Sequence, residues 1–456
     1  MRLLEKQTRF ILFLSAVAMI MNIANATGIP GTTIDQYDPS KADNGTTLFA
    51  YTDESAGPMV VQINMVGEII WQYIIPEGMN TGIGPGFDAE LLTNGNILIA
   101  LSRHGLYEVT RAGSIIWSNT DSQVSHDADR LANGNTIYIY GDNDTEADAV
   151  VKEVDKTGSL VWSWYATNGY NIPPYYPSSN IARQGWVHAN SVTRMSNSNT
   201  LISARNFNLT IEVNPAGETV WSYAWTNLYP GEFPIGYDPH EPELLGDTNL
   251  LVCLQRLSPY EVAEINRDTG APVWEYHREG LRTTRDSDRL PNGNTLIVGV
   301  LTQNEQSVIF EVTPTKQIVW QLRLTNRPAA TSPGFFFKAQ RVDDFDQDGL
   351  QNLIDPDDDN DGMADVDEII AGTSPTDSND FFKISSIEYS RKSHAIISWN
   401  SVTGRTYKVF VTTNNVSLWP TGFVYHANGD GNLLSYTNGN NGKIKKYYKI
   451  TVELSE

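Results

Sequence analysis

Cysteine, clustered basic residues and long apolar runs are all scarce in this chain of 456 residues. Its single cysteine, Cys253, excludes a disulfide within the chain and lies in an apolar run, where a buried and chemically inert thiol is expected. Lys and Arg total 32 against 54 Asp and Glu, and they form no basic stripe that could neutralise phosphates. Because nucleic-acid binding depends on such stripes, we expect no nucleic-acid partner.

The apolar run nearest in length to a membrane span lies at the start of the chain. Three basic residues surround the start of an apolar segment at residues 10–23, and residues 24–26 read Ala-Asn-Ala, an A-x-A cleavage site. The apolar segment is short for a membrane span, so a secretory signal peptide at residues 1–26 is favoured over an uncleaved anchor. The protein is therefore predicted to be exported, to a periplasmic or extracellular location, without a stable membrane span after cleavage.

A repeated G-x-x-x-W pattern organises the first three quarters of the chain. The tryptophans that end the repeats, the last of which has lost its glycine, are Trp71, Trp117, Trp162, Trp221, Trp274 and Trp320. Their separations of 46, 45, 59, 53 and 46 residues fit one four-stranded propeller blade each and are too long for a solenoid of helix pairs. Six copies predict six blades.

Strand patterns give the propeller its boundaries. Residues 27–45 are rich in turn-forming residues and are expected to be a leader. The strand patterns begin at Thr46 with a blade that lacks its innermost strand, and a matching strand appears only at residues 335–342. Pairing of these distant segments would close the ring and remove its free edges, so the propeller is predicted to span residues 46–342.

Residues 343–380 contain fourteen acidic residues and no Lys or Arg. Two segments within them match a calcium-loop template, with oxygen ligands at alternate positions and glycine at the sixth. The expected ligands of the first loop are Asp344, Asp346, Asp348, the Leu350 carbonyl, Asn352 and Asp355. Those of the second are Asp357, Asp359, Asp361, the Met363 carbonyl, Asp365 and Glu368. Their tandem spacing of 13 residues resembles thrombospondin type-3 calcium repeats, which implies structural Ca²⁺, whereas the alternative is an acidic disordered linker.

The C-terminal segment, residues 381–456, returns to alternating strands joined by Asn- and Gly-rich turns, which predicts a small immunoglobulin- or fibronectin-like β-sandwich. The whole protein is therefore expected to be all-β: a six-bladed β-propeller, an acidic calcium-binding linker and a C-terminal sandwich. Either an attachment or sugar-contacting role or that of a spacer fits the sandwich.

Three histidines are expected to converge at the mouth of the propeller channel. His126, His188 and His240 each open an inner strand, and the corresponding residues of other blades are Arg285 and two phenylalanines. Such residues could merely cap their blades or bind a metal. Nearby cations, and few carboxylates beyond Asp127 and Glu241, favour a site that stabilises an anion.

The HANS segment at residues 188–191, the SAR segment ending at Arg205 and the later histidine make the chain similar to the bacterial aryl-sulfate sulfotransferase family. That resemblance implies a six-bladed propeller in which a histidine carries a sulfuryl group from an aryl sulfate to a phenol, without a nucleotide cofactor. It implies His240 as the nucleophile. The residues that the resemblance assigns to the sulfuryl oxygens and the rest of the pocket are His188, Asn190, Arg205, His126 and Lys338.

Tyrosines in the insertions before two inner strands were further candidates, for stacking on an aromatic substrate: Tyr175, Tyr176, Tyr229 and Tyr237. A different class of function also remains open. A non-catalytic propeller could bind a sulfated or otherwise anionic glycan, with the linker and the sandwich as spacer and anchor. A quinone-dependent dehydrogenase is less well matched, because the calcium loops lie outside the propeller.

Overall fold

The computed structural model describes residues 28–455 except for short internal gaps. Those gaps are residues 54–56, 81–82, 84–86, 142, 174, 176–183, 229–236, 256–259, 325–335, 345, 347–351, 353–354, 390–393, 414–418 and 440–444. The predicted signal peptide lies outside the described residues. Within them, no helix has the length and apolar character needed to span a membrane.

Six antiparallel sheets form the propeller, in agreement with the predicted fold class. Blade one contains β25 (Ala339–Val342), β2 (Thr46–Asp53), β3 (Gly57–Asn64) and β4 (Ile69–Ile74). Blade two contains β5 (Asp88–Leu91), β6 (Ile97–Leu101), β7 (Gly105–Val109) and β8 (Ile115–Asn119). Blade three contains β9 (Val124–Arg130), β10 (Thr136–Tyr140), β11 (Val151–Val154) and β12 (Leu160–Trp164).

The remaining blades follow the same order, from inner to outer strand. Blade four contains β13 (Ala189–Arg194), β14 (Thr200–Ala204), β15 (Leu209–Val213) and β16 (Thr219–Ala224). Blade five contains β17 (Pro239–Leu245), β18 (Asn249–Leu254), β19 (Val262–Asn266) and β20 (Pro272–Tyr276). Blade six contains β21 (Leu281–Arg289), β22 (Thr295–Leu301), β23 (Ser307–Val312) and β24 (Ile318–Leu324). Short 3₁₀ turns interrupt the loops: η1 (Ala166–Asn168), η3 (Arg205–Phe207), η4 (Trp225–Asn227) and η5 (Gln303–Glu305).

Ring closure occurs as the sequence predicts, through β25 pairing with β2 across almost 300 residues of chain, from Thr46 to Val342. The expected leader contributes a further strand that sequence patterns did not reveal. β1 (Thr32–Tyr37) pairs with the outer strand β24, so blade six has five strands. Asp35 of β1 binds the Arg323 guanidinium through Nε at 2.6 Å and Nη2 at 2.9 Å, which fastens the added strand.

The repeated tryptophan has a physical role at every blade junction. Each indole N–H donates to a backbone carbonyl of the next blade, from Trp71 to the Arg111 carbonyl at 2.8 Å onward around the ring. The sixth tryptophan, Trp320, donates to the Met65 carbonyl of blade one at 2.8 Å and so completes the circle. Hydrophobic clusters fill all six spaces between neighbouring blades. The core of the propeller is therefore a set of layers between blades.

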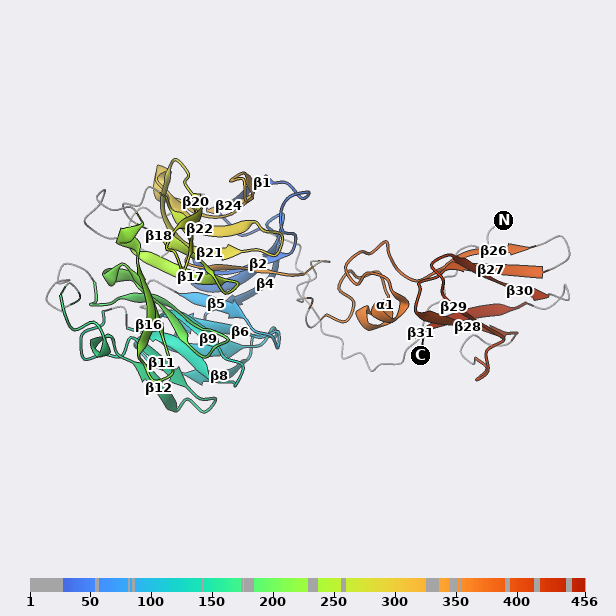
Figure 1. Ribbon diagram of the computed structural model, residues 1–456, viewed down its shortest axis with the longest axis horizontal. Helices are drawn as coiled ribbons and strands as arrows, with labels where there is room; N and C mark the ends of the chain where they lie inside the picture. The colour runs from blue at the N-terminus through green and yellow to red at the C-terminus, as the bar shows by residue number, and fades with distance from the viewer. Residues whose placement is uncertain are drawn as a thin grey trace.

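Beyond the propeller, the chain forms the helix α1 (Asp365–Ala371) and two three-stranded sheets. One sheet contains β26 (Ile384–Tyr389), β27 (His394–Asn400) and β30 (Leu433–Gly439). The other contains β28 (Arg405–Thr412), β29 (Tyr425–Asn428) and β31 (Tyr447–Leu454). Residues of both sheets share one hydrophobic cluster around Trp399 and Tyr407, so they pack face to face. Figure 1 shows these sheets and the propeller at opposite ends of the molecule, with α1 between them.

Candidate functional site

Strand pairing places Asn190, and not His188, at the position equivalent to His126. In β9 and β13 the last residues, Arg130 and Arg194, each pair with the first residue of the blade's second strand. Four residues before these arginines stand His126 and Asn190. The sequence-based alignment of the three histidines in one register is therefore wrong for His188, which lies two residues before the shared position.

A β-bulge accompanies this position in each of the three blades. The strand register shifts in β9, β13 and β17 beside His126, Asn190 and His240. A bulge bends its strand and redirects side chains, and bulges are frequent next to active sites. The local irregularity thus lets residues from different sequence positions face one point at the channel mouth.

Two of the histidines meet directly. The His126 and His188 rings have centroids 4.9 Å apart and lie edge to face, and both side chains are buried. His126 also packs on Phe337, 5.5 Å between centroids, and its Nδ1 contacts the Ser125 hydroxyl. Burial lowers the pKa of His126 well below its usual value, and the neighbouring His188 and His240 rings lower it further. The His126 imidazole is therefore neutral at physiological pH.

His240 has both ring nitrogens engaged. Its Nδ1 lies 2.9 Å from the Asp238 carbonyl oxygen, and its Nε2 lies 2.8 Å from Nδ2 of Asn190. Since a carbonyl only accepts, Nδ1 carries the proton and Nε2 holds the lone pair that accepts from the Asn190 amide. Burial lowers the pKa of His240 well below its usual value, and the Arg205 charge lowers it further. The outcome is a buried neutral imidazole with its lone pair on the Asn190 side.

Two guanidinium groups complete this end of the channel. Arg205, the first residue of η3, has its Nε 3.9 Å from the Asp238 carboxylate. Arg285 stacks over Phe337 with 5.4 Å between the guanidinium carbon and the ring centroid. Burial, and then the charge of Arg205, lower the pKa of Arg285 to about 10, so the guanidinium stays charged at neutral pH. The family resemblance did not assign Arg285, although its place opening an inner strand was visible in the sequence.

Lys338 lies with carboxylates and not with the imidazoles. Its ammonium contacts Asp127, Asp88 at 3.4 Å and Glu241 at 3.1 Å. Burial opposes the charged form, but these carboxylates outweigh it and hold the pKa of Lys338 well above its usual value. The structure therefore corrects the expectation that Lys338 completes the anion pocket. The reason is its position: Phe337 occupies the mouth, and Lys338 is one residue further along the closing strand.

An acidic layer fills the channel beside Lys338, where sequence reasoning had counted only two carboxylates. A cavity of about 560 Å³ opens here, and its acidic lining from the inner strands is Asp88, Glu90, Asp127, Asp129, Glu241, Glu243, Asp286 and Asp288. Several of these groups serve the ring structure. Asp127 accepts the Val192 N–H at 2.6 Å and Asp286 accepts the Ala339 N–H at 2.9 Å, each from the next blade. The carboxylates thus join neighbouring inner strands.

Tyrosines proposed to stack on an aromatic substrate have other surroundings. Tyr175 packs against Phe207 with 5.1 Å between ring centroids, and Tyr237 is 1% exposed in the core between blades four and five. Tyr176 and Tyr229 lie outside the described residues. The two tyrosines that the structure describes therefore contribute to packing at the base of the insertions.

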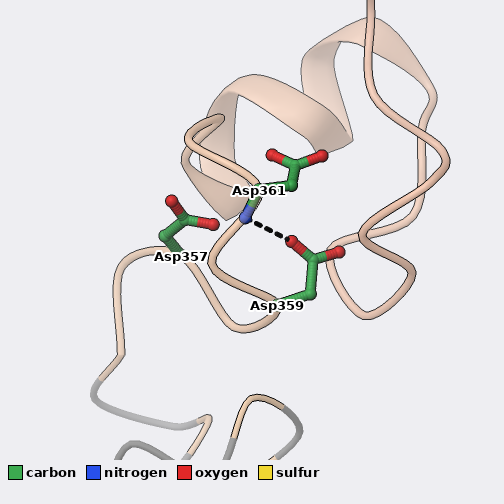
Figure 2. Close-up of side chains that lie close together, drawn as sticks. All are labelled: Asp357, Asp359 and Asp361. Carbon is green, nitrogen blue, oxygen red and sulfur yellow. Dashed lines mark hydrogen bonds between the residues drawn. The ribbon is translucent and has the colours of Figure 1, made fainter.

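The second predicted calcium loop brings three of its acidic side chains together, those of Asp357, Asp359 and Asp361 (Figure 2). One carboxylate oxygen from each of them lies within 4.8 Å of the other two. Glu368, at the twelfth position on α1, is fully buried, and neither of its carboxylate oxygens has a hydrogen-bond partner among the described residues. Burial raises the pKa of Glu368 to about 7, and Asp359 and Asp361 add to the rise. Oxygen ligands with an orphaned buried carboxylate fit a Ca²⁺ ion.

Among the other expected calcium ligands, some have other hydrogen-bond partners and some lie outside the described residues. Asp365 accepts the Asp358 N–H at 2.8 Å through one carboxylate oxygen. In the first loop, Asp348 and Leu350 lie outside the described residues, whereas Asn352 donates its backbone N–H to the Asp343 carbonyl at 3.0 Å. Only the second loop can therefore be assessed as a set.

A known protein family matches the first part of the propeller. Residues 32–235 match the arylsulfotransferase (ASST) family model. The match begins at β1 and covers four of the site residues, namely His126, His188, Asn190 and Arg205, but it ends before His240. It supports an aryl sulfotransferase-like function in general terms. No curated protein matches the sequence.

Solved structures of low identity were also found. A protein of unknown function from Bacteroides caccae is 15% identical, with a TM-score of 0.46, and the alignment covers 65% of this chain and 98% of that one. A streptogramin B lyase is 10% identical, with a TM-score of 0.40 and coverage of 65% and 88%. BamB from Moraxella catarrhalis is 12% identical, with a TM-score of 0.34 and coverage of 68% and 93%. At such scores we base no argument on these likenesses.

Proposed function

We propose that this protein transfers a sulfuryl group from an aryl sulfate to a phenol through a covalent intermediate on Nε2 of His240. The main support for this proposal is the hydrogen bond between His240 Nδ1 and the Asp238 carbonyl, which puts the lone pair on Nε2. A neutral imidazole is a competent nucleophile, and the lowered pKa of His240 keeps it neutral at physiological pH. The family match over residues 32–235 supports an aryl sulfotransferase-like function in general.

Charge around His240 suits an anionic substrate. The Arg205 and Arg285 guanidiniums both act on the His240 ring electrostatically, so both lie near it. The sulfuryl oxygens would accept hydrogen bonds from these groups, from the Asn190 amide and from an imidazole N–H of the His126/His188 pair. Lys338 instead offsets the carboxylates of the neighbouring layer.

In the first step Nε2 forms a bond to sulfur while the bond from sulfur to the aryl oxygen breaks. The departing phenolate takes a proton from solvent. In the second step the acceptor phenol oxygen attacks sulfur, the N–S bond breaks, and the acceptor's proton leaves to solvent. The net reaction exchanges one sulfuryl group for one proton, so His240 returns to its starting state and no nucleotide is consumed.

A burst assay tests the proposal. The full-length mature protein is mixed with a chromogenic aryl sulfate and a phenol, beside the His240→Ala variant and, as the control, His277→Ala, whose side chain is 56% exposed on the outer part of the propeller. We expect wild type and the control to release the chromophore and to carry sulfuryl label on His240. Absence of turnover with several donors, together with retained binding of a sulfated glycan, would replace the proposal by the non-catalytic alternative.

We also propose a structural Ca²⁺ site in the second acidic loop, supported by the buried carboxylate of Glu368. The loop and α1 are tied to the sandwich, because Arg405 Nη2 donates to the Ile369 carbonyl at 3.0 Å and Gly372 packs closely against Val402. Calcium should therefore raise the unfolding temperature of the C-terminal sheets. Glu368→Gln should weaken calcium binding at least about tenfold in calorimetry, since the bidentate twelfth ligand is lost. Asp367→Asn, at the exposed neighbouring position, is the control, and equal affinities in both variants would refute the assignment.

A further inference from the structure

The segments that lead into β13 and β17, two of the three site-bearing inner strands, are each gripped by a side chain of the preceding blade. The Asp144 carboxylate, between β10 and β11, accepts the Val187 N–H at 2.9 Å and the His188 N–H at 2.8 Å. One blade further on, Asn208 Oδ1 accepts the Tyr237 N–H at 2.8 Å and, more weakly, the Asp238 N–H at 3.4 Å. The same device therefore recurs at equivalent places, although one acceptor is Asp and the other is Asn.

Each grip ends on a residue with a left-handed backbone. His188 has φ of 47° and Asp238 has φ of 45°, while Asn208 itself has φ of 56°. Left-handed backbone costs a non-glycine residue about 1–2 kcal/mol, so such residues need surroundings that hold them. Asn tolerates this conformation better than most residues. The acceptor oxygen of Asn208 supplies part of what holds the backbone on the N-terminal side of Asp238 in place.

Asp238 in turn contacts two groups of the site, the His240 imidazole and the Arg205 guanidinium. Its carbonyl oxygen receives the His240 Nδ1 proton, and its buried carboxylate lies 3.9 Å from Arg205 Nε. The segment is held from other sides as well, because the Ser203 hydroxyl donates to the Pro239 carbonyl at 2.7 Å and Gln255 donates its N–H to the Tyr237 carbonyl at 2.9 Å. A small rotation of the Asp238 peptide would remove the acceptor that fixes the His240 tautomer.

We propose that Asn208 is a positioning residue for His240: its side-chain oxygen holds the backbone N–H groups of Tyr237 and Asp238 and so orients the Asp238 carbonyl, which keeps the imidazole proton on Nδ1 and the lone pair on Nε2. Asn208 touches neither His240 nor, in the proposed reaction, the substrate. The expected effect on kcat rests on the proposed function of His240 as the nucleophile. The expected effect on the His240 tautomer does not depend on any reaction.

Two variants of Asn208 distinguish a positioning role of its side-chain oxygen from a purely structural role of the residue in the turn. Asn208→Gly keeps the left-handed backbone without strain but removes the oxygen. Asn208→Asp keeps an acceptor oxygen at the same place. Asp144→Asn serves as the matched control, since it alters the equivalent grip on His188 in the previous blade and should leave the His240 tautomer unchanged.

The primary readout is the ¹⁵N chemical shift of the His240 ring nitrogens in the full-length mature protein, in the absence of substrate. We expect the Nδ1–H tautomer in wild type and in Asn208→Asp, and a mixture of tautomers in Asn208→Gly. In the sulfotransfer assay, kcat of Asn208→Gly should fall on the order of tenfold to a hundredfold with KM changed less than about twofold, as expected when a reacting group is misplaced.

The outcomes are distinguishable. An unchanged His240 tautomer in Asn208→Gly would overturn the positioning role, whatever the activity. A shifted tautomer in a protein that shows no sulfotransfer with any donor would sustain the positioning role and remove the proposed function. A loss of the tautomer in Asn208→Asp as well as in Asn208→Gly would also overturn it, because the acceptor oxygen would then be irrelevant.

Discussion

Glu311 and Arg341 form a buried ion pair between blade six and the closing strand of blade one. Arg341 Nη2 lies 2.9 Å from Glu311 Oε2, and their side chains are 1% and 0% exposed. The equivalent contact between blades two and three, from Arg130 Nη2 to Glu108 Oε2, has the same length, but its side chains are 15% and 10% exposed. These two examples of a contact that recurs between blades therefore differ in solvent access.

We predict that Glu311→Gln destabilises the propeller much more than Glu108→Gln. The amide keeps the shape of Glu311 and the oxygen that accepts the Asp43 N–H at 2.7 Å and the Asn294 amide at 2.6 Å. It removes the charge opposite Arg341, and leaving one member of a buried pair uncompensated costs about 3–5 kcal/mol. Water reaches the Glu108 pair, so its loss should cost only about 1–2 kcal/mol.

Urea unfolding followed by tryptophan fluorescence measures both free energies, because the junction tryptophans lie at the blade interfaces. The double variant Glu311→Gln/Arg341→Met should recover part of the loss, since it removes the stranded charge as well. Equal losses for Glu311→Gln and Glu108→Gln, or a loss below about 1 kcal/mol for Glu311→Gln, would show that burial does not govern these pairs.

Two further predictions concern pH. Burial, and then the neighbouring Glu243, raise the pKa of Asp288 to about 7, so between its unfolded value of about 4 and pH 7 the native state holds a proton that the unfolded chain has released. The free energy of unfolding should therefore fall as pH rises from about 4 to about 8, and Asp288→Asn should flatten that fall in urea titrations; an identical slope in the variant would contradict this. For catalysis, the lowered pKa of His240 predicts that kcat/KM for an aryl sulfate falls less than about twofold between pH 7.5 and 5.5. A fall of about tenfold, as for a histidine with a pKa near 6.5, would refute a perturbed nucleophile.

The architecture of the propeller can be predicted from sequence patterns alone. The spacing of the tryptophans revealed six blades, because each indole makes the same bond to the following blade and so recurs with every repeat. The missing inner strand of the first blade pointed to closure by residues far along the chain, and β25 fulfils that expectation. The acidic spacing around Asp357 likewise brought together three of the side chains that the template named, Asp357, Asp359 and Asp361. Patterns of this kind are local, so they survive without knowledge of the fold.

Which residues meet in the channel depends on how the strands pair. Motif alignment put His188 in the register of His126, but the pairing of β13 with β14 gives that place to Asn190, which binds His240. The family resemblance implies Lys338 as part of the anion pocket, yet it lies among carboxylates contributed by several blades. Strand register and contacts across the channel cannot be read from the periodicity of the sequence, because both depend on how separate strands pair.

The side chains that grip the inner strands were invisible for the same reason. Asp144 and Asn208 stand in loops of no particular pattern, and each acts on backbone groups about 30 or more residues away in the next blade. Their oxygen atoms acquire a function only when the blades pack side by side. Periodicity along one strand therefore reveals which face is buried, whereas the chemistry at the channel mouth arises from contacts between blades that no single strand encodes.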